Sequence, residues 1–363
     1  MKSLIHNLLR LLLAMPALLL LAGCDTTEAD GPSPQGVIVA NQGNFGDANG
    51  SISVFDPVSG ALDAGAVTSI GTIIQSVLLH EQSLFVMSNT GGRIDVFDAE
   101  SFERTAQIPE VVSPRYMVAD GHTGYVSSLY GAEGTFSGGL VTVVDLDGHT
   151  KVAEIPVGDN PEGLALVGTR LYVANHGFGA GTSVSVIDVA AWEVIETIDV
   201  QCDGPRFVET DLHGDVFVFC TGRTVYDEDF NPIGETDGAV RVLDGETGAI
   251  LKHISVDGRI GTAGPGQDAF LAPTVQVAFV VKDERSLLVF DTESHDLEEE
   301  IGPFSGPALS AVAYDDQSGR LYLGRSRGFT QAGEVSIHDR SGTELDRFTA
   351  GVAPAFIAFS SSE

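Results

Sequence analysis

SVID, residues 185–188, is one of seven versions of a single tetrad, and the recurrence of this tetrad decides the fold. Every version ends in aspartate, and the seven aspartates are Asp56, Asp98, Asp145, Asp188, Asp244, Asp291 and Asp339. Successive copies are separated by 42 to 56 residues. A period of this length, with strands in each repeat, is typical of a β-propeller. Seven copies therefore predict seven blades.

The alternation of apolar and polar residues predicts that each tetrad lies in a strand. The residues two and four positions before the aspartate are apolar in every copy, as in Val184 and Val186, and the residue between them is polar in all but one copy. Because successive side chains of a strand point to opposite faces, this pattern predicts a half-buried strand. The aspartate then opens a turn, where its carboxylate can accept backbone N–H groups.

Three further strands accompany each tetrad. In the fourth repeat a proline-led segment covers residues 161–166, an aromatic–aliphatic pair follows at 172–173, and a last strand covers 193–200. Four strands make one blade, so the sequence predicts an all-β, seven-bladed β-propeller of four-stranded blades. Two separate β domains are the alternative for a chain of this length.

The two ends of the chain predict how the ring closes. The first repeat begins at residues 36–41 and lacks a proline-led inner strand, whereas residues 354–360 supply a spare one. We therefore expect residues 354–360 to pair beside residues 36–41. Such closure removes exposed sheet edges, which otherwise promote aggregation.

The N-terminal residues have the features of a lipoprotein signal peptide, which we assign to residues 1–23. Two basic residues, Lys2 and Arg10, precede a short apolar run, residues 11–22, that is not long enough to span a bilayer comfortably. The run ends in LAGC, residues 21–24, which resembles a lipobox and implies that Cys24 receives a diacylglycerol group. An ordinary signal peptide with a chance cysteine is the alternative.

Residues 24–35, which begin with the lipidated cysteine, form an acidic segment that we interpret as a flexible tether. Residues 36–363 then make up the propeller. A lipid on Cys24 would anchor the protein to a membrane without spanning it. We therefore expect a monomer in the cell envelope, at the outer membrane, on either the cell-surface or the periplasmic leaflet.

The charge balance excludes some partners. The chain has 51 acidic and 19 basic residues and a formal net charge of −32. Nucleic acid and anionic membrane surfaces are therefore poor partners on electrostatic grounds. The acidic excess suits a salt-rich habitat, where screening weakens self-repulsion.

Two cysteines, Cys202 and Cys220, remain in the propeller. They flank adjacent strands of one predicted hairpin, and an exported compartment permits a disulfide between them. Two unbonded thiols are the alternative.

Loop lengths indicate a binding face. The loops between the second and third strands of the blades gather on one face, and they are long at residues 41–51, 127–139 and 220–238. Such irregular lengthening on a rigid scaffold is typical of binding loops. Insertions that exposed loops merely tolerate are the alternative.

The same face collects scarce cations, aromatic rings and amides. We predict the following ligand-binding residues: Gln42, Asn44, Phe45, Gln75, Arg115, Tyr116, Tyr130, Asn160, His176, Phe178, Arg206, Arg223, Tyr226, Lys282, Arg325, Arg327 and Phe329. Arginine combined with aromatic and amide groups suits a planar polar ligand that carries some negative charge. Each arginine taken singly is also explained by a structural ion pair.

Catalytic motifs are present only in unsuitable contexts. GRSRG at residues 324–328 has nucleophile-elbow spacing but is followed by another strand instead of a helix. Residues 227–238 start like a calcium loop but lack its glycine and its final glutamate, so only a loosely bound Ca²⁺ remains open there. No pair of histidines has metal-ligand spacing. We therefore predict no enzyme, no catalytic residue, no cofactor and no resident metal.

Several segments resemble known propeller families. LYVANHG at 171–177, with the strands at 182–200, resembles the YVTN-type (YncE-like) seven-bladed propellers. Residues 40–56, with SPRYM at 113–117 and PEGLAL at 161–166, resemble the surface propeller lipoproteins of Bacteroidetes and relatives. One branch of that group captures cobalamin beside a TonB-dependent transporter. The resemblance thus implies a corrinoid as the ligand and such a transporter as the partner, and it transfers no binding residue.

The sequence leaves three functional hypotheses. The first is a lipid-anchored binding protein that captures a small nutrient on the loop face for a transporter. The second is an envelope protein-interaction scaffold without a small ligand. The third is a metal-dependent lactonase or lyase-type propeller enzyme, in which the catalytic groups would come from separate blades.

Overall fold

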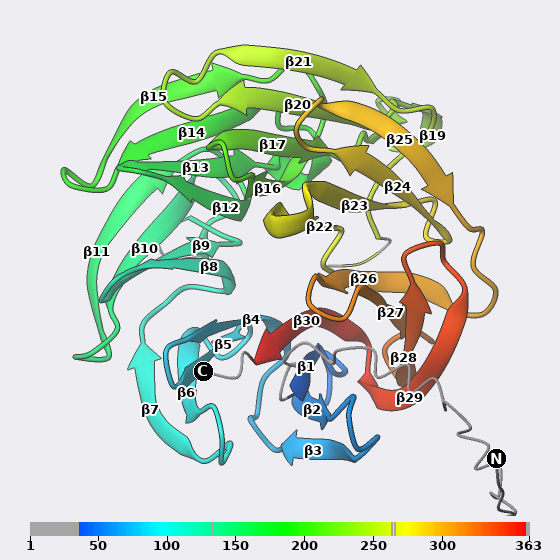
Figure 1. Ribbon diagram of the computed structural model, residues 1–363. Coiled ribbons are helices and arrows are strands. Elements are labelled where there is room, and N and C mark those ends of the chain that lie inside the picture. Colours follow the sequence, from blue (N-terminus) through cyan, green and yellow to red (C-terminus); the bar gives the residue numbers. More distant parts are fainter. Residues whose placement is uncertain (1–35, 132–133, 263, 265, 361–363) are drawn as a thin grey trace, which may run out of the picture. The chain divides into compact units, whose positions relative to one another are not determined.

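The computed structural model describes residues 36–131, 134–262, 264 and 266–360. The predicted signal peptide, Cys24 and the tether lie outside the described residues. Within these ranges the chain forms a ring of seven four-stranded antiparallel sheets, as the repeat predicts (Figure 1). None of the helices in the described ranges is long and apolar enough to cross a membrane.

The first four blades follow the chain in order around the ring. From the inner to the outer strand, blade 1 contains β30 (Pro354–Ser360), β1 (Gly36–Asn41), β2 (Ser51–Phe55) and β3 (Leu62–Val67). Blade 2 contains β4 (Ile74–His80), β5 (Ser83–Ser88), β6 (Arg93–Asp98) and β7 (Arg104–Pro109). Blade 3 contains β8 (Pro114–Asp120), β9 (Thr123–Ser128), β10 (Gly139–Asp145) and β11 (Thr150–Val157). Blade 4 contains β12 (Pro161–Val167), β13 (Arg170–Asn175), β14 (Ser183–Asp188) and β15 (Glu193–Asp199).

The last three blades complete the ring. Blade 5 contains β16 (Pro205–Thr210), β17 (Asp215–Cys220), β20 (Ala239–Asp244) and β21 (Ile250–Ser255). Blade 6 contains β22 (Ala269–Ala272), β23 (Val277–Lys282), β24 (Ser286–Asp291) and β25 (Asp296–Ile301). Blade 7 contains β26 (Ala308–Asp315), β27 (Arg320–Ser326), β28 (Ala332–Asp339) and β29 (Glu344–Val352). In the part of the chain that the structure describes, short 3₁₀ turns η2 (Gly177–Gly179) and η3 (Pro273–Val275) lie in connections.

The C-terminal strand closes the ring as expected. β30 runs antiparallel to β1, with Gly36 opposite Ser360 and Asn41 opposite Pro354. The inner position of blade 1 is therefore filled by the last strand of the chain. The ring has no open edge at its seam, so the first blade is as fully paired as the others.

The tetrad residues form the contacts between neighbouring blades. Val184 and Val186 of blade 4 are fully buried, and they pack in one cluster with Val216 and Val218 of blade 5. Equivalent apolar pairs fill the other interfaces. Burial of each valine contributes about 1.5–3 kcal/mol, so the repeat stabilises every blade against the next.

The repeated aspartates end their strands by accepting backbone N–H groups. Asp188 Oδ1 accepts from Ala190 at 2.8 Å, and Asp244 Oδ1 accepts from Thr247 at 2.8 Å. The side-chain and backbone hydrogen bonds from Thr247 hold the pKa of Asp244 below its ordinary value. These carboxylates thus act in turn formation, on the face opposite the long loops.

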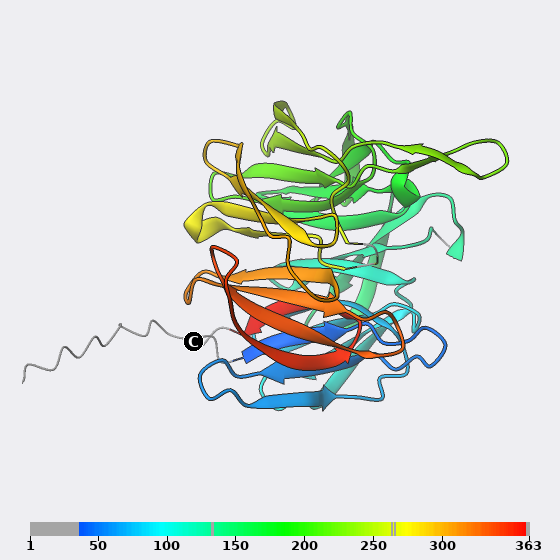
Figure 2. The same ribbon diagram turned by 90° about the vertical axis from the view of Figure 1, so that its right-hand side faces the viewer.

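Two features of blade 5 go beyond the expected four strands. The long loop at residues 220–238 contains its own hairpin, β18 (Thr224–Tyr226) and β19 (Pro232–Glu235), which projects from the loop face (Figure 2). A disulfide joins Cys202 to Cys220, whose Cα atoms are 6.0 Å apart. This bond links the entry to β16 with the end of β17, at the base of the projecting hairpin.

Removal of β30 should disrupt the propeller. A chain that ends at Ala353 leaves β1 with an unpaired edge at the centre of the ring, so we expect aggregation or a large loss of stability. Size-exclusion chromatography and denaturant unfolding measure this effect against a control that ends at Ser360. Equal unfolding midpoints for the two truncations would contradict the role of β30.

Candidate ligand-binding cavity

A large cavity opens on the loop face of blades 3 to 6. Its volume is about 1460 Å³, and its walls come from the inner strands, the inter-blade links and the β18–β19 hairpin. This volume exceeds the 300–1,000 Å³ that is usual for small-molecule pockets. The cavity therefore has room for a bulky ligand.

A β-bulge near the start of the inner strand presents a side chain to the cavity floor. In β8, Pro114 pairs with Ser128, but the next matched pair is Met117 with Val126, so one extra residue is inserted. The same shift follows the first residue of β4, β12 and β16. Bulges bend a strand and re-aim side chains. The polar residues at these bulges are Gln75, Arg115, Glu162 and Arg206.

Arg115 and Glu162 form a buried two-point ion pair between blades 3 and 4. Arg115 Nε donates to Glu162 Oε2 at 2.9 Å, and Nη2 donates to Oε1 at 2.6 Å. Arg115 Nη1 also donates to Gln75 Oε1 of blade 2. Planar, two-point geometry makes this one of the stronger kinds of ion pair. It links three blades at the cavity floor.

Tyr116 fills the channel below this ion pair. Its hydroxyl accepts from Gln75 Nε2 at 3.2 Å and donates to the Gly266 carbonyl at 3.3 Å. Its ring lies 5.1 Å from the ring of Phe207 in blade 5 and 6.4 Å from that of Phe356 in blade 1. Burial raises the pKa of Tyr116 well above its ordinary value, so the hydroxyl stays protonated. This side chain supports the cavity floor from below.

A second buried ion pair continues the floor. Arg206 Nη1 lies 3.0 Å from Asp268 Oδ2, and Arg206 Nη2 donates to the Gly264 carbonyl at 2.7 Å. Asp268 Oδ1 accepts from the Thr262 backbone at 2.8 Å. Burial raises the pKa of Asp268, and Arg206 opposes that shift. The floor thus alternates positive and negative groups from blade 3 to blade 6.

Asn160 and His176 supply a neutral polar wall. Asn160 Oδ1 accepts from the Phe178 backbone at 3.1 Å and lies 3.1 Å from His176 Nδ1. Burial lowers the pKa of His176 to about 4, although Glu162 opposes the shift. The imidazole is therefore neutral at pH 7. If Nδ1 carries the proton toward Asn160, Nε2 is left as an acceptor.

Cations and exposed aromatic rings surround the mouth. Arg223 lies 3.2 Å from Asp203, and Arg259 Nη1 donates to Thr224 Oγ1 at 3.3 Å. Three cavity-lining rings are more than half exposed, namely Phe178, Tyr226 and Phe230. Exposed apolar groups that cluster around a hollow are typical of binding sites.

The structure gathers part of the predicted residue set in this cavity. The residues that line it are Arg115, Asn160, His176, Phe178, Arg206, Arg223 and Tyr226. Gln75 and Tyr116 belong to the hydrogen-bond network of its floor. Tyr130 packs against Phe136, whose ring in turn lies 6.2 Å from that of Phe178.

The other predicted residues lie outside the cavity. Three cations are engaged elsewhere: Arg325 is buried and donates to Ser336 Oγ at 2.6 Å, Lys282 pairs with Glu300 at 2.9 Å, and Arg327 pairs with Glu334 at 3.1 Å. The remaining four are Gln42, Asn44, Phe45 and Phe329.

These four residues belong to the seam between blades 1 and 7. Asn44 Nδ2 donates to the Phe329 carbonyl at 2.9 Å, and Gln42 is buried with its backbone N–H bonded to Ala353. Loop length alone could not show that the cavity is displaced toward blades 3 to 6.

Several cavity groups were missed from the sequence. Glu162 and Asp268 are the partners of the two floor arginines, and Arg259 and Phe230 line the wall and mouth. The recurring proline-led motif was the available signal for Glu162, because it occupies the same place as Arg115 and Arg206. Nothing local marks Arg259.

In the incomplete calcium loop, the Asp227 carboxylate accepts hydrogen bonds from its own turn. Asp227 Oδ1 accepts from the backbone N–H groups of Asp229 at 2.9 Å and Asn231 at 2.8 Å, and Asn231 Nδ2 donates to the same carboxylate. The Asp227 carboxylate therefore shapes the tip of the β18–β19 hairpin.

Comparisons with known proteins support the fold. No family model and no curated protein matches the chain. A chain of Kuenenia stuttgartiensis hydrazine synthase superimposes with a TM-score of 0.62 at 18% identity, covering 78% of this chain and 88% of that one. The computationally designed Ika8 protein gives a TM-score of 0.59 at 10% identity, covering 91% of this chain and 95% of its own. At such identities the likeness establishes the fold alone.

Neutralising one partner of the floor ion pair should be costly. Glu162→Gln leaves Arg115 buried without its counter-charge, so we expect a loss of about 3 kcal/mol in unfolding free energy. Replacing both residues, as in Arg115→Met with Glu162→Leu, should cost less than this single change. Denaturant unfolding measures both, with Glu300→Gln as the exposed-pair control, which should cost less than about 1 kcal/mol. A Glu162→Gln loss no larger than that of the control would contradict the prediction.

His176 should make stability depend on pH. Its folded pKa of about 4 lies below the ordinary histidine pKa of 6.5, so below pH 6.5 the unfolded chain takes up a proton that the folded chain does not. The stabilisation is complete above pH 6.5 and is lost as the pH falls toward 4. Relative to His176→Gln, the wild type should lose about 2 kcal/mol over this range, since the ring is partly open to the cavity. Parallel stability curves for the two proteins would refute the assignment.

Proposed function

We propose that this chain is a lipid-anchored envelope protein that binds a small, bulky, partly anionic ligand in the loop-face cavity. The observation that carries the proposal is the cavity itself, about 1460 Å³ in volume, with four arginines in its wall. The whole chain has only 19 basic residues against 51 acidic ones. The same lining also contains five acidic residues, Glu162, Asp227, Glu235, Asp283 and Glu284, so the cavity is close to neutral in a chain whose formal net charge is −32. A near-neutral hollow that holds four arginines is the part of this acidic protein best suited to a ligand with an anionic group.

Two of these arginines retain hydrogen-bonding capacity. Arg206 Nε and Arg259 Nε are buried and have no hydrogen-bond partner among the described residues. Arg259 also makes no ion pair with a described carboxylate. A buried donor without an acceptor costs about 1–3 kcal/mol, so such atoms call for an explanation. An acceptor group on a bound ligand supplies one.

The chemistry of the walls suits a ligand with both polar and flat apolar parts. Phe178, Tyr226 and Phe230 offer ring faces at the mouth, and Asn160 and His176 offer hydrogen-bonding groups deeper in. A corrinoid combines a bulky ring system with many amides and a phosphate. Together with the resemblance to surface propeller lipoproteins, this makes a corrinoid the first candidate and a TonB-dependent transporter the candidate recipient.

A binding screen tests the proposal. Residues 25–363, purified in high salt, are mixed with cyanocobalamin, haem or sugar acids, then desalted and examined by absorbance and native mass spectrometry. We expect one ligand per chain. Arg223→Ala should weaken binding about tenfold or more, since a charge-assisted hydrogen bond contributes about 1.5–3 kcal/mol.

The control variant is Arg327→Ala, which removes a surface arginine outside the cavity and should leave binding unchanged. Retention of haem or a sugar acid in place of cyanocobalamin would change the ligand and keep the site. Retention of nothing would replace the proposal with the envelope scaffold.

A further inference from the structure

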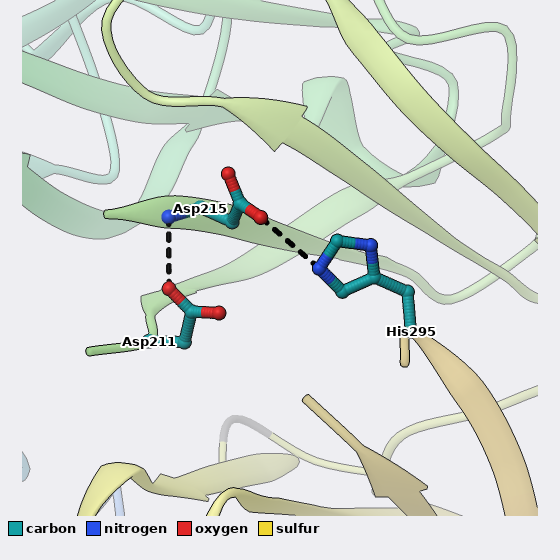
Figure 3. A group of neighbouring side chains, drawn as sticks. All are labelled: Asp211, Asp215 and His295. Carbon is teal, nitrogen blue, oxygen red and sulfur yellow. Dashed lines mark hydrogen bonds and ion pairs between the residues drawn. The ribbon is translucent and has the colours of Figure 1, made fainter. Parts of the chain in front are cut away.

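Three metal-ligating side chains meet on the face opposite the cavity. Asp211 lies in the turn between β16 and β17, Asp215 opens β17, and His295 lies in the turn between β24 and β25. One ligand atom from each lies within 4.8 Å of the others. The cluster joins blade 5 to blade 6, because His295 lies far along the chain from Asp211 and Asp215 (Figure 3).

In its turn, the Asp211 carboxylate accepts hydrogen bonds with one oxygen and leaves the other oxygen without a partner among the described residues. Asp211 Oδ1 accepts from the backbone N–H groups of His213 at 2.9 Å and Asp215 at 2.8 Å. Oδ2 is buried and has no hydrogen-bond partner among the described residues. Only 9% of the residue is exposed. In Figure 3 this second oxygen is turned to the side on which His295 lies.

The imidazole of His295 is also held in place. Its Nε2 lies 3.0 Å from Asp215 Oδ2, and its ring packs edge-on against Phe217 at 5.6 Å between centroids. The side chains of His295 and Asp215 are 17% and 21% exposed, respectively. The cluster is therefore preorganised and still reachable from solvent.

The charges around the cluster are unbalanced. Neither Asp211 nor Asp215 pairs with a lysine or arginine among the described residues. The two carboxylates therefore share one half-buried site without a lysine or arginine in the described ranges that compensates their repulsion. A bound cation would remove this repulsion and contact Asp211 Oδ2.

We propose that Asp211, Asp215 and His295 form a binding site for a divalent transition-metal ion of the Zn²⁺ class. The imidazole nitrogen favours Zn²⁺ and similar ions over Ca²⁺ and Mg²⁺, which prefer all-oxygen ligands. Three protein ligands leave a fourth tetrahedral position for water, which the partial exposure of the cluster allows. The ion would cross-link two adjacent blades.

Calorimetric titration of the metal-stripped full chain with Zn²⁺ tests the site. We expect one equivalent to bind. Asp211→Asn and His295→Gln should each weaken Zn²⁺ binding at least about tenfold. Loss of a residue that only hydrogen-bonds to a metal ligand already weakens metal affinity about tenfold or more, so loss of a ligand itself should cost at least as much. Co²⁺, used as a spectroscopic probe, should show visible absorption of four-coordinate geometry in the wild type and should lose it in Asp211→Asn and His295→Gln.

The control is His122→Gln. His122 Nδ1 lies 3.0 Å from Asp147 Oδ2, the same distance as in the proposed site, but that pair is exposed and belongs to no group of three metal-ligating side chains among the described residues. This variant should bind Zn²⁺ like the wild type. The comparison therefore separates a three-ligand site from an ordinary histidine–aspartate pair.

Thermal unfolding adds a second readout that does not depend on variant stability. Zn²⁺ should raise the Tm of the wild type and of His122→Gln, because it binds only the folded state. It should leave the Tm of the near-isosteric Asp211→Asn unchanged. Absence of one-equivalent binding by the wild type, or unchanged affinity in Asp211→Asn or His295→Gln, would overturn the proposal.

Discussion

The packing of Tyr116 at the centre of the ring is the contact on which the shape of the cavity depends. This single side chain contacts Gln75, Phe207, Gly266 and Phe356, which belong to four other parts of the propeller. Its ring packs between the rings of Phe207 and Phe356, and its hydroxyl has hydrogen-bond partners in Gln75 and Gly266. The ion pairs above it are buried because the channel below them is filled. Without this floor, the charged groups would face an open water channel.

The fold could be predicted because its signal is local and repeated. Each blade depends on alternation within a few residues, such as Val184, Ser185 and Val186, so every copy of the tetrad reports the same strand independently. Ring closure followed from a count of inner strands, and β30 takes the missing place. The β18–β19 hairpin was not predicted, because its pairing lies inside a loop that breaks the repeat.

The candidate site could be predicted where the repeat marks it and, in part, where the loops beside the repeat are long. Arg115 and Arg206 follow the strand-opening proline, and the bulge at that position brings both to the cavity floor. The same proline-led motif marks Glu162, the partner of Arg115, but no local pattern shows that the two side chains pair, and none marks Asp268, the partner of Arg206. Arg325 is the opposite case. The sequence predicted it as a ligand-binding residue, but its side chain is buried and donates to Ser336 within blade 7. Burial and partner choice are three-dimensional properties.

The packing of Tyr116 in the central channel limits how a ligand could reach the cavity. Propellers have an axial passage, yet here Tyr116 and the paired charges of Arg115 and Glu162 close it between the two faces. Under the proposed function, a ligand would then enter and leave the cavity by the same opening. A receiving transporter would have to approach the mouth beside the projecting β18–β19 hairpin. The opposite face of the propeller, with the short aspartate turns, would stay available for a different contact while exchange proceeds.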